Sequence, residues 1–403
     1  DLRVTAFDTF QVLFPRPKLD EDPVVIVDID DESLSKLGQW PWSRDTLAKL
    51  TDTTQLAAVT GFDIVFAEPD RTGSKQLQKL YSDNKDLVRL LSKTTDNDDL
   101  FAESISNHGT VVLGLAPNNK TDSSKNQSKH GLVVQGDDPK IFVRPYTGLQ
   151  NNLSRLEEAS AGLGSMSIGN DDVIVRTLPS FENIDGNLVP SLPLEMVRVA
   201  IGASTYQIKS SNASSEEAFG ENTGINHIKL GSLIMPTNPD GSFWLYPTLS
   251  NNLTSIPAWK LLDGSLDPNF FEGKVVIVGT SASGLFDLRS NAIEKNIPGV
   301  SIIAQFIQQI FSNTFLKRPD WLLGLEFLMG LIFSVLITLT IQKTGPVGGL
   351  VAFGIGNGSI VYGSYYFFST FQYLVDPISP MVICLIAYLT ITFFNFLFTE
   401  LER

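Results

Sequence analysis

The sequence predicts a mixed α/β domain, with a largely parallel sheet flanked by helices, followed by a region of three transmembrane helices. Two patterns lead to this fold class. In the first 320 residues, short runs of β-branched residues alternate with amphipathic helical segments, which is typical of βαβ units. Three long apolar stretches then follow one another. We therefore divide the chain into residues 1–320 and 321–403.

Charged residues separate the same two regions. Residues 1–320 hold 28 of the 30 Lys and Arg residues and 40 of the 44 Asp and Glu residues, so their net charge is −12. This acidity disfavours a nucleic acid partner, because binding to phosphates needs a basic surface. Cys384 is the single cysteine, so no disulfide forms within the chain.

The elements of the α/β domain follow in order. Residues 1–14 predict an amphipathic helix, which we interpret as the continuation of a transmembrane helix that precedes this sequence. A first βαβ unit then combines two apolar strands with the helices between them. The predicted strands of the domain lie at residues 24–29, 57–66, 110–115 and 274–278. The predicted helices lie at residues 31–37, 43–56, 97–107, 193–202 and 298–315.

Glycine and asparagine turns predict two β-hairpins between these elements. The first joins residues 162–168 to 171–181 through Gly169–Asp171, and the second joins residues 228–234 to 242–246. Two polar stretches of low complexity, residues 117–130 and 203–224, predict mobile loops.

The apolar stretches lie at about residues 321–342, 346–370 and 377–398. Each is longer than the roughly 20 residues that a helix needs to cross the hydrocarbon core. Lys343, between the first two, is expected on the cytoplasmic side by the positive-inside rule. We therefore expect a multi-pass protein of the cell (inner) membrane, with residues 1–320 extracytoplasmic, the C-terminus cytoplasmic and the lipid bilayer as a partner.

Carboxylates gather where two of the predicted strands end. Ligands of open α/β sheets bind beyond the carboxyl ends of parallel strands, so these acids are candidates for contact with a cation or a basic ligand. The alternative is that they cap helices and satisfy turn backbone. Whether they hold a metal is left open. The candidates are Asp28, Asp30, Asp63, Glu68 and Asp70.

The segment Gln39–Arg44 contains a Trp-Pro-Trp sequence. Trp40 and Trp42 are candidates for the wall of a ligand pocket, with Arg44 beside them. The alternative is a packed corner between strand and helix in which Arg44 pairs with an acid. No catalytic set, Cys/His cluster or nucleophile elbow stands out, and we predict no catalytic residue or cofactor in this chain.

Several blocks of sequence together resemble one family. Residues 24–50, VVIVDIDDESLSKLGQWPWSRDTLAKL, resemble the opening of the type-two CHASE domain, an extracellular sensor of bacterial receptors. Later blocks fit in the same order, among them GFDIVFAEPD, PSLPLEMVRVA and KVVIVGTSASGLFDLRS. The resemblance covers nearly all of residues 1–318, and the apolar stretches that follow are also typical of the family.

This resemblance implies a sensor for an unidentified extracellular or periplasmic ligand. It also implies an output domain after residue 403, first a class III adenylate or guanylate cyclase and second a histidine or Ser/Thr kinase. A cyclase would use ATP and a divalent metal and would work as a homodimer. Two other hypotheses are a solute-binding protein and a metal-dependent extracytoplasmic hydrolase that uses Asp28, Asp30 and Asp63.

Overall fold

The computed structural model describes residues 2–120, 128–168, 174–213, 224–285 and 287–401. The chain forms two compact units, one of residues 17–214 with 223–313 and the other of residues 1–16 with 314–403. The first is an α/β domain, and the second contains the long apolar helices.

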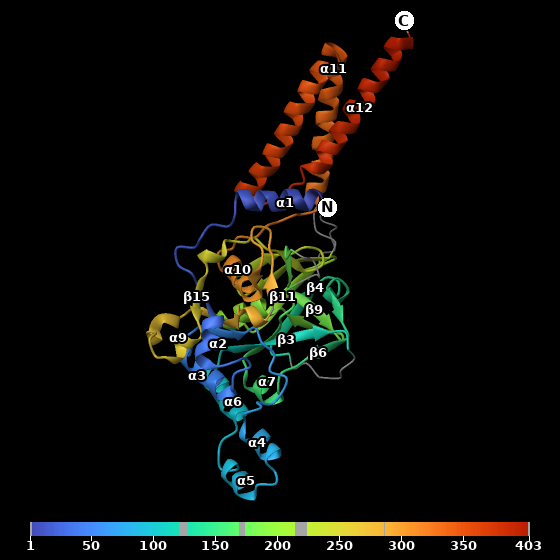
Figure 1. Cartoon of the computed structure of the whole chain (residues 1–403). Coiled ribbons are helices and arrows are strands. Elements are labelled where there is room, and N and C mark those ends of the chain that lie inside the picture. Colours follow the sequence, from blue (N-terminus) through green and yellow to red (C-terminus); the bar gives the residue numbers. More distant parts are fainter. Residues whose placement is uncertain (1, 121–127, 169–173, 214–223, 286, 402–403) are drawn as a thin grey trace. The chain divides into compact units, whose positions relative to one another are not determined.

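A largely parallel sheet lies at the centre of the α/β domain (Figure 1). Its strands follow the order β15-β1-β16-β2-β3-β6, and β7 also pairs with β3. Each of these pairs is parallel except β3 with β6. This confirms the predicted fold class. The strands are β1 (Val24–Ile29), β2 (Val59–Phe62), β3 (Val111–Asn118), β6 (Gly148–Gln150), β7 (Gly162–Ser165), β15 (Thr254–Pro257) and β16 (Val275–Thr280).

Strands β1 and β16 lie side by side within the sheet, and helices cover both of their faces. Their first four residues, VVIV in both strands, are apolar and buried, as expected of strands buried on both faces, and Asp28 follows them in β1. Strand β2 is shorter than predicted. After Phe62 the chain leaves the sheet, and Phe66 folds back so that its ring centroid lies 5.7 Å from that of Phe62.

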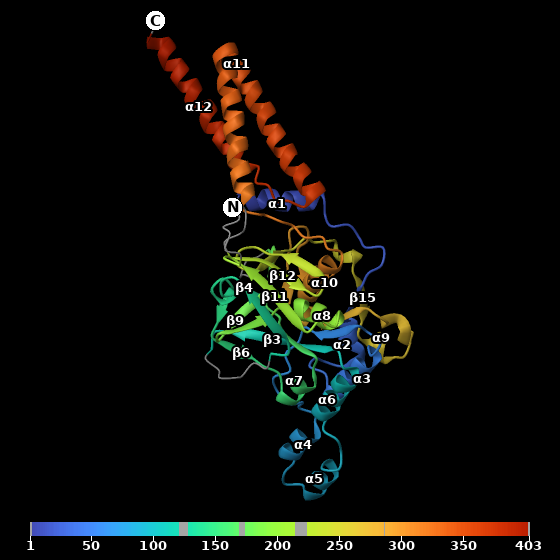
Figure 2. The same ribbon diagram turned by 180° about the vertical axis from the view of Figure 1, so that it is seen from behind.

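Helices cover both faces of this sheet (Figure 2). On one face, Leu47 and Phe101 pack with Val25 and Val27 of β1 in a single core cluster. The helices on this face are α2 (Asp31–Leu37), α3 (Arg44–Thr53), α6 (Asn97–His108), α7 (Ser154–Ala159) and α9 (Trp259–Leu262). On the other face lie α8 (Leu192–Ala200) and α10 (Gly299–Phe311).

A row of residues without side chains lets α8 and α10 approach the sheet closely. A Cβ atom on Gly279 of β16 would lie 2.6 Å from the Val300 side chain of α10. A Cβ atom on Gly164 of β7 would lie 2.5 Å from the Leu192 Cα atom of α8. The start of each of these helices therefore lies over the carboxyl end of a parallel strand.

Two helices that the sequence did not predict, α4 (Ser74–Leu80) and α5 (Lys85–Leu91), form an excursion between β2 and α6. They project from the α/β domain in both views (Figures 1 and 2). The described part of α5 has no buried residue, so this excursion adds little to the core. Short 3-10 helices occur elsewhere in the domain at Pro139–Ile141, Ser250–Asn252, Pro268–Phe271 and Ser283–Leu285.

Smaller sheets complete the domain, and they correct both hairpin predictions. Strand β7 pairs with β3 in the central sheet, whereas β8 pairs with β14, so residues 162–181 form no hairpin across their described parts. The turn predicted at Gly169–Asp171 lies outside the described residues. The second predicted hairpin is also wrong, because β12 pairs with β13 and turns at Gly231. A turn does form between β13 and β14, where Gly241 N donates to the Asn238 carbonyl at 2.9 Å, but β14 then pairs with the distant strand β8.

Some residues of the two predicted mobile loops belong to strands instead. Pro117 and Asn118 belong to β3, and residues 205–210 form β11, which pairs with β4 and β12. The strands of the smaller sheets are β4 (Gly131–Gln135), β5 (Pro145–Tyr146), β8 (Thr177–Pro179), β9 (Phe181–Ile184), β10 (Asn187–Pro190), β11 (Thr205–Ser210), β12 (Ile225–Leu230), β13 (Leu233–Pro236), β14 (Ser242–Trp244), β17 (Leu288–Arg289) and β18 (Ile297–Pro298).

In the other unit, the described residues contain two helices that are long and apolar enough to cross a membrane, α11 (Trp321–Phe371) and α12 (Ile378–Leu401). The sequence predicted three such helices, and this count is corrected. The first two predicted segments both belong to α11, with no loop between them. Gly345 has a φ of 79°, outside the helical range, and divides α11 into two arms.

The two arms of α11 fold back against each other. A Cβ atom on Gly356 would lie 3.1 Å from the ring of Phe333, although a straight helix would separate these positions by about 35 Å. Ile337, Ile341 and Ile360 form a small core with Cys384 of α12. Gly349 and Gly356 therefore serve helix packing within the chain, whereas no atom lies within 4 Å of a Cβ atom built on Gly354 or Gly358.

Helix α1 (Leu2–Leu13) also belongs to this unit. Its Phe10 ring lies 5.9 Å from the rings of Tyr365 and Phe368 of α11. Phe7 and Phe10 are buried, whereas Leu2 and Leu13 are exposed. Its buried face is therefore centred on the two phenylalanines.

A buried polar contact fixes the start of α11. Arg318 donates two hydrogen bonds to the Glu326 carboxylate, at 2.7 and 3.0 Å, and a third to the Leu374 carbonyl. The Asp376 backbone N–H donates to the same carboxylate at 2.8 Å. Glu326 is only 2% exposed, so its charge is neutralised inside this unit by Arg318.

Candidate functional site

Two of the predicted acids lie in one row at the carboxyl edge of the central sheet. Asp28 of β1 is opposite Gly279 of β16. Val278 is opposite Phe62, so continuing this register by one residue brings Asp63 opposite Gly279 as well. In-register residues of parallel strands point to the same face. Asp28 and Asp63 are therefore on the face covered by α8 and α10, separated by a strand that has no side chain at this level.

The acids at the end of β1 make local contacts. Ser281 donates to Asp28 Oδ2 at 2.7 Å, whereas Asp28 Oδ1 is buried and has no hydrogen-bond partner. Burial raises the pKa of Asp28, and the hydrogen bond from Ser281 opposes this rise. The Asp30 side chain accepts from Ser33 N at 2.7 Å and caps α2. This hydrogen bond agrees with the alternative interpretation, in which Asp30 caps a helix.

Asp63 is the most strongly perturbed acid of this edge. Burial, together with the negative charge of Asp287, raises its pKa to about 7, although Arg289 opposes the rise. Arg289 Nε donates to Asp287 Oδ1 at 3.3 Å. The backbone carbonyl of Asp287 accepts from Gly299 N, the first residue of α10. Asp63 therefore lies beside an ion pair that borders the start of α10.

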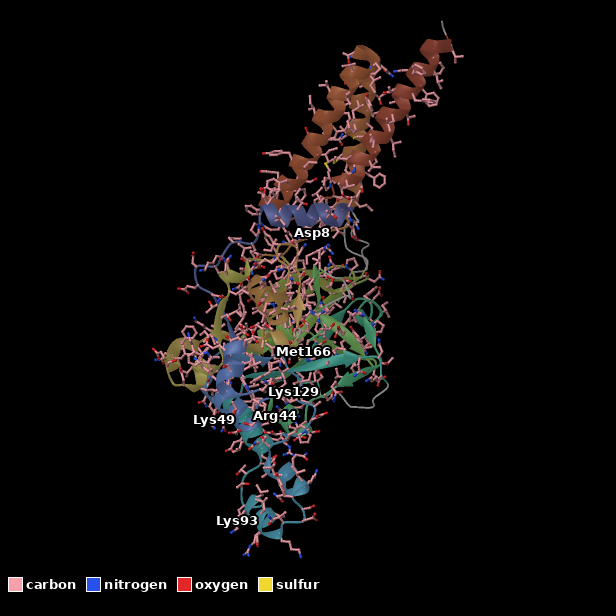
Figure 3. All side chains as sticks on the ribbon, viewed as in Figure 1. Asp8, Arg44, Lys49, Lys93, Lys129 and Met166 are labelled. Atoms are coloured by element: carbon pink, nitrogen blue, oxygen red, sulfur yellow. The ribbon has the colours of Figure 1, made fainter. Side chains whose placement is uncertain are left out.

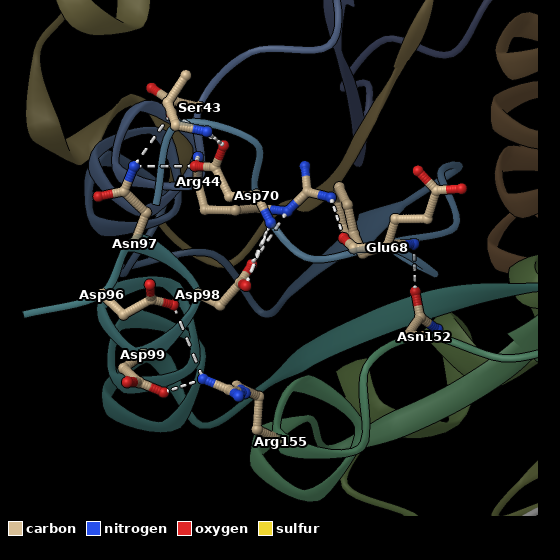
Figure 4. A network of polar contacts seen from close by, with 12 residues as sticks. Ser43, Arg44, Glu68, Asp70, Asp96, Asn97, Asp98, Asp99, Asn152 and Arg155 are labelled. Atoms are coloured by element: carbon tan, nitrogen blue, oxygen red, sulfur yellow. Dashed lines mark hydrogen bonds and ion pairs between the residues drawn. The ribbon is translucent and has the colours of Figure 1, made fainter. Parts of the chain in front are cut away.

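Arg44 and Asp70 belong to a separate polar network (Figure 4). Asp70 accepts from the Arg44 backbone N–H at 2.7 Å, and Arg44 Nε lies 3.7 Å from Asp98 Oδ1. Burial opposes ionisation of Asp70, but its hydrogen bonds from Arg44, Thr72 and Asn97 outweigh burial and lower its pKa. Arg44 therefore pairs with an acid, Asp98, which agrees with the alternative of a packed corner in which Arg44 has an acidic partner.

This network holds both ends of the α4–α5 excursion. Asp70 precedes the excursion and also binds Asn97, which begins α6 after it. Arg155 of α7 pairs with Asp96 and Asp99 (Figure 4). Sequence reasoning missed these acids of α6, because nothing local connects them to Arg44. The Glu68 side chain is exposed, and only its carbonyl takes part, as an acceptor from Arg44.

The two tryptophans form a packed corner before α3. Trp42 is 4% exposed and donates from its indole N–H to the Gly38 carbonyl at 2.8 Å. The Trp40 ring packs edge-on against Trp42, with centroids 5.6 Å apart, and Trp40 also contacts the main core. Both side chains thus have structural partners, and their contact with a ligand stays a prediction.

The structure therefore divides the predicted site residues. Asp28, Asp30 and Asp63 lie near the carboxyl edge of β1 and β2, whereas Glu68, Asp70 and Arg44 lie around the base of the excursion. Within the described ranges, no group of three or more His, Cys, Asp or Glu side chains is arranged to hold a metal ion.

A cavity of about 450 Å³ lies further along the same edge of the sheet, and sequence reasoning missed it. It is formed where β3 and β7 end, with Met166 on its wall, and Met166 is labelled within the domain in Figure 3. The missing side chain of Gly114 makes room for Met166, whose sulfur would lie 2.2 Å from a Cβ atom there. The polar residues that line the cavity are Asn118, Asn119, Arg144, Tyr146, Ser167 and Arg289.

A buried acid lies next to this cavity. Glu182 of β9 is 1% exposed and accepts a hydrogen bond from Ser165. Burial raises the pKa of Glu182, and hydrogen bonds from Ser165 and Ser167 oppose the rise. No sequence motif connects Glu182 with Arg144 or Arg289, since they lie on separate strands and loops.

The model of the CHASE2 domain matches residues 1–340. No curated protein and no solved structure matches the chain.

Proposed function

The chain belongs to the CHASE2 domain family, and from this we propose that it is the extracytoplasmic, signal-sensing input region of a membrane receptor. One observation carries the proposal: a single chain joins an α/β domain of a sensor family to helices long enough to cross a membrane. The family match reaches residue 340 and so includes most of the first arm of α11.

The proposal puts the α/β domain outside the cell (inner) membrane and the C-terminus in the cytoplasm. Two features support this orientation. Helices α11 and α12 are long and apolar enough to cross a membrane, and Lys343 lies at the bend of α11. With two arms in α11 and one helix in α12, the chain crosses the bilayer an odd number of times after the α/β domain.

Cysteine labelling tests this topology. In a Cys384→Ala background, we compare Lys93→Cys, on the excursion labelled in Figure 3, with Lys343→Cys at the bend of α11. An impermeant maleimide should label Lys93→Cys in intact spheroplasts, and Lys343→Cys only after permeabilisation. Labelling of both positions from the same side of the membrane would exclude the proposed topology.

We further propose that the output domain follows residue 403 and is an adenylate or guanylate cyclase that works as a homodimer. The resemblance to cyclase receptors supports this choice over a histidine or Ser/Thr kinase. ATP and a divalent metal then belong to that output domain. The test is to express the whole coding sequence and measure cyclic nucleotide formation in membranes. Autophosphorylation without cyclic nucleotide formation would assign a kinase instead.

A further inference from the structure

Strand β4 is an edge strand with an apolar, exposed surface. It ends the four-stranded sheet of order β13-β12-β11-β4, at the side of the α/β domain in Figures 1 and 2, and among the described strands β11 alone pairs with it. All five residues of its sequence, GLVVQ, are exposed. Leu132, Val133 and Val134 are 37%, 46% and 39% exposed. Because successive side chains of a strand alternate, apolar groups reach solvent on both faces of β4.

The composition of β4 leaves its outer edge open to pairing with a further strand. Proline, charged side chains and short length are the features that prevent edge strands from pairing with other chains. Strand β4 has five residues, and none of them is proline or charged. Other edge strands of the domain each include a proline, namely Pro236 in β13, Pro257 in β15, Pro190 in β10 and Pro145 in β5. An apolar edge without such protection is a template for strand addition.

The backbone of β4 directs hydrogen-bonding groups outward at two positions. Gly131 N donates to the Ser204 carbonyl at 2.8 Å, and the parallel register with β11 continues from Gly131 to the end of the strand. In a parallel pair, residues alternate between bonding to the neighbouring strand and pointing away from it. Gly131 and Val133 therefore bond toward β11. The N–H and C=O groups of Leu132 and Val134 point to the outer edge.

This outer edge is complementary to itself. In an antiparallel pair centred on Val133, Leu132 of one copy lies opposite Val134 of the other, so that their outward N–H and C=O groups meet in hydrogen-bonded pairs. Val133 then lies opposite its own counterpart in a non-hydrogen-bonded pair, in which side chains approach most closely. The nearest formally charged residues are Lys129 before the strand and Asp137 after it. Antiparallel pairing brings these unlike charges toward each other at both ends.

We propose that two copies of this chain pair through β4, antiparallel and centred on Val133. The two four-stranded sheets then form one continuous sheet of eight strands. The contact is isologous, since the same residues contribute from both copies, and it closes at two copies. It is a contact of the α/β domain itself, and it rests on neither the proposed membrane topology nor the type of output domain.

Disulfide cross-linking of the full chain in membranes tests this pairing. In the Cys384→Ala background, Val133→Cys places two thiols in a non-hydrogen-bonded pair whose Cα atoms lie about 4.5 Å apart, within the range of a disulfide. Mild oxidation should therefore link two copies. Ile234→Cys is the matched control, because Ile234 is 55% exposed but lies on the opposite edge strand of the same sheet. Equal cross-linking of both variants, or a link from Val133→Cys to a different polypeptide, would overturn the proposal.

A charge variant tests whether β4 holds the two copies together. Val133→Lys puts two positive charges opposite each other, and it should raise the dissociation constant of the dimer at least about tenfold relative to the wild type and to Ile234→Lys. Light scattering of the purified chain in detergent measures this association. Because Val133 is exposed, the variant should fold, and its unfolding temperature verifies this.

Two results of this experiment would overturn the pairing through β4. One is a wild type that is monomeric at about 50 µM, and the other is a Val133→Lys variant that associates as tightly as the wild type. Either result would leave the receptor proposal standing, because that proposal is tested by labelling from the two sides of the membrane and by the output of the whole coding sequence.

Discussion

At the scale of single residues, Asp63 makes stability depend on pH. Its folded pKa of about 7 lies above the ordinary value of 3.8, so the folded state holds a proton that the unfolded state loses. Stability therefore falls as the pH rises from about 4 to 7, and the full loss persists above 7. The cause is burial beside Asp287, which opposes a second negative charge.

We predict that Asp63→Asn is more stable than the wild type at pH 8. The advantage should shrink toward pH 4, where wild-type Asp63 is protonated in both states. Chemical unfolding of the detergent-solubilised protein at several pH values measures this difference. Asp83→Asn, in the exposed loop between α4 and α5, is the control and should show no such trend. A wild type and an Asp63→Asn variant with parallel pH profiles would contradict the assignment.

Arg44 shows the opposite case, in which a buried charge has partners. Arg44 is 7% exposed and Asp98 is 2% exposed, so removal of the guanidinium leaves a buried carboxylate uncompensated. We predict that Arg44→Gln lowers the free energy of unfolding by about 3 kcal/mol. The exposed control Arg89→Gln should change it by less than about 0.5 kcal/mol. A loss as small as that of the control would mean that the network does not hold the excursion.

At the scale of elements, glycine decides how closely helices approach the sheet. A Cβ atom at Gly164 would lie 2.5 Å from the Leu192 Cα atom and 2.9 Å from its nitrogen, and neither backbone atom is able to rotate away. We predict that Gly164→Ala costs about 1–3 kcal/mol through displacement of α8. Gly284→Ala, where no atom lies within 4 Å, is the matched control. Thermal unfolding of both variants measures the difference, and equal midpoints would contradict the packing.

The fold of α11 is a second property of an element. Phe333 and Gly356 face each other across its two arms, whereas Gly358 has no atom within 4 Å of a Cβ built on it. In the Cys384→Ala background, a short bismaleimide should join Phe333→Cys to Gly356→Cys within one chain. The pair Phe333→Cys with Gly358→Cys should react much less. Mass spectrometry identifies the products, and equal yields would indicate that α11 does not fold back at Gly345.

At the scale of the whole molecule, the proposed receptor depends on the connection between α10 and α11. Residues 312–320 are the only link in the chain from the end of α10 to the start of α11. We predict that one Ala inserted after Asn313 changes how the full-length receptor responds to its signal, measured as output in membranes. The same insertion after Ser82, between α4 and α5, should leave the response unchanged. An unaltered response in both would argue against coupling through residues 298–320.

Much of the architecture was predictable because it depends on local composition. The apolar runs of β1 and β16 are buried on both faces, and the predicted bounds of β1 and α2 agree with the structure. The lengths of the apolar segments predicted helices able to cross a membrane, although two of these segments form the single broken helix α11. Burial and periodicity show as patterns among residues that are close together in the sequence, so they can be recognised without knowledge of the fold.

The candidate site depended on the tertiary structure. The strand order brings β16 between β1 and β2, and so puts Gly279 between Asp28 and Asp63. The same packing brings Arg144 and Arg289, which are 145 positions apart in the sequence, to one cavity. Sequence alone determined a domain of parallel strands and a set of lipid-compatible helices. Only the long-range pairing of strands decided which charged side chains meet, because that pairing is set by packing between distant segments.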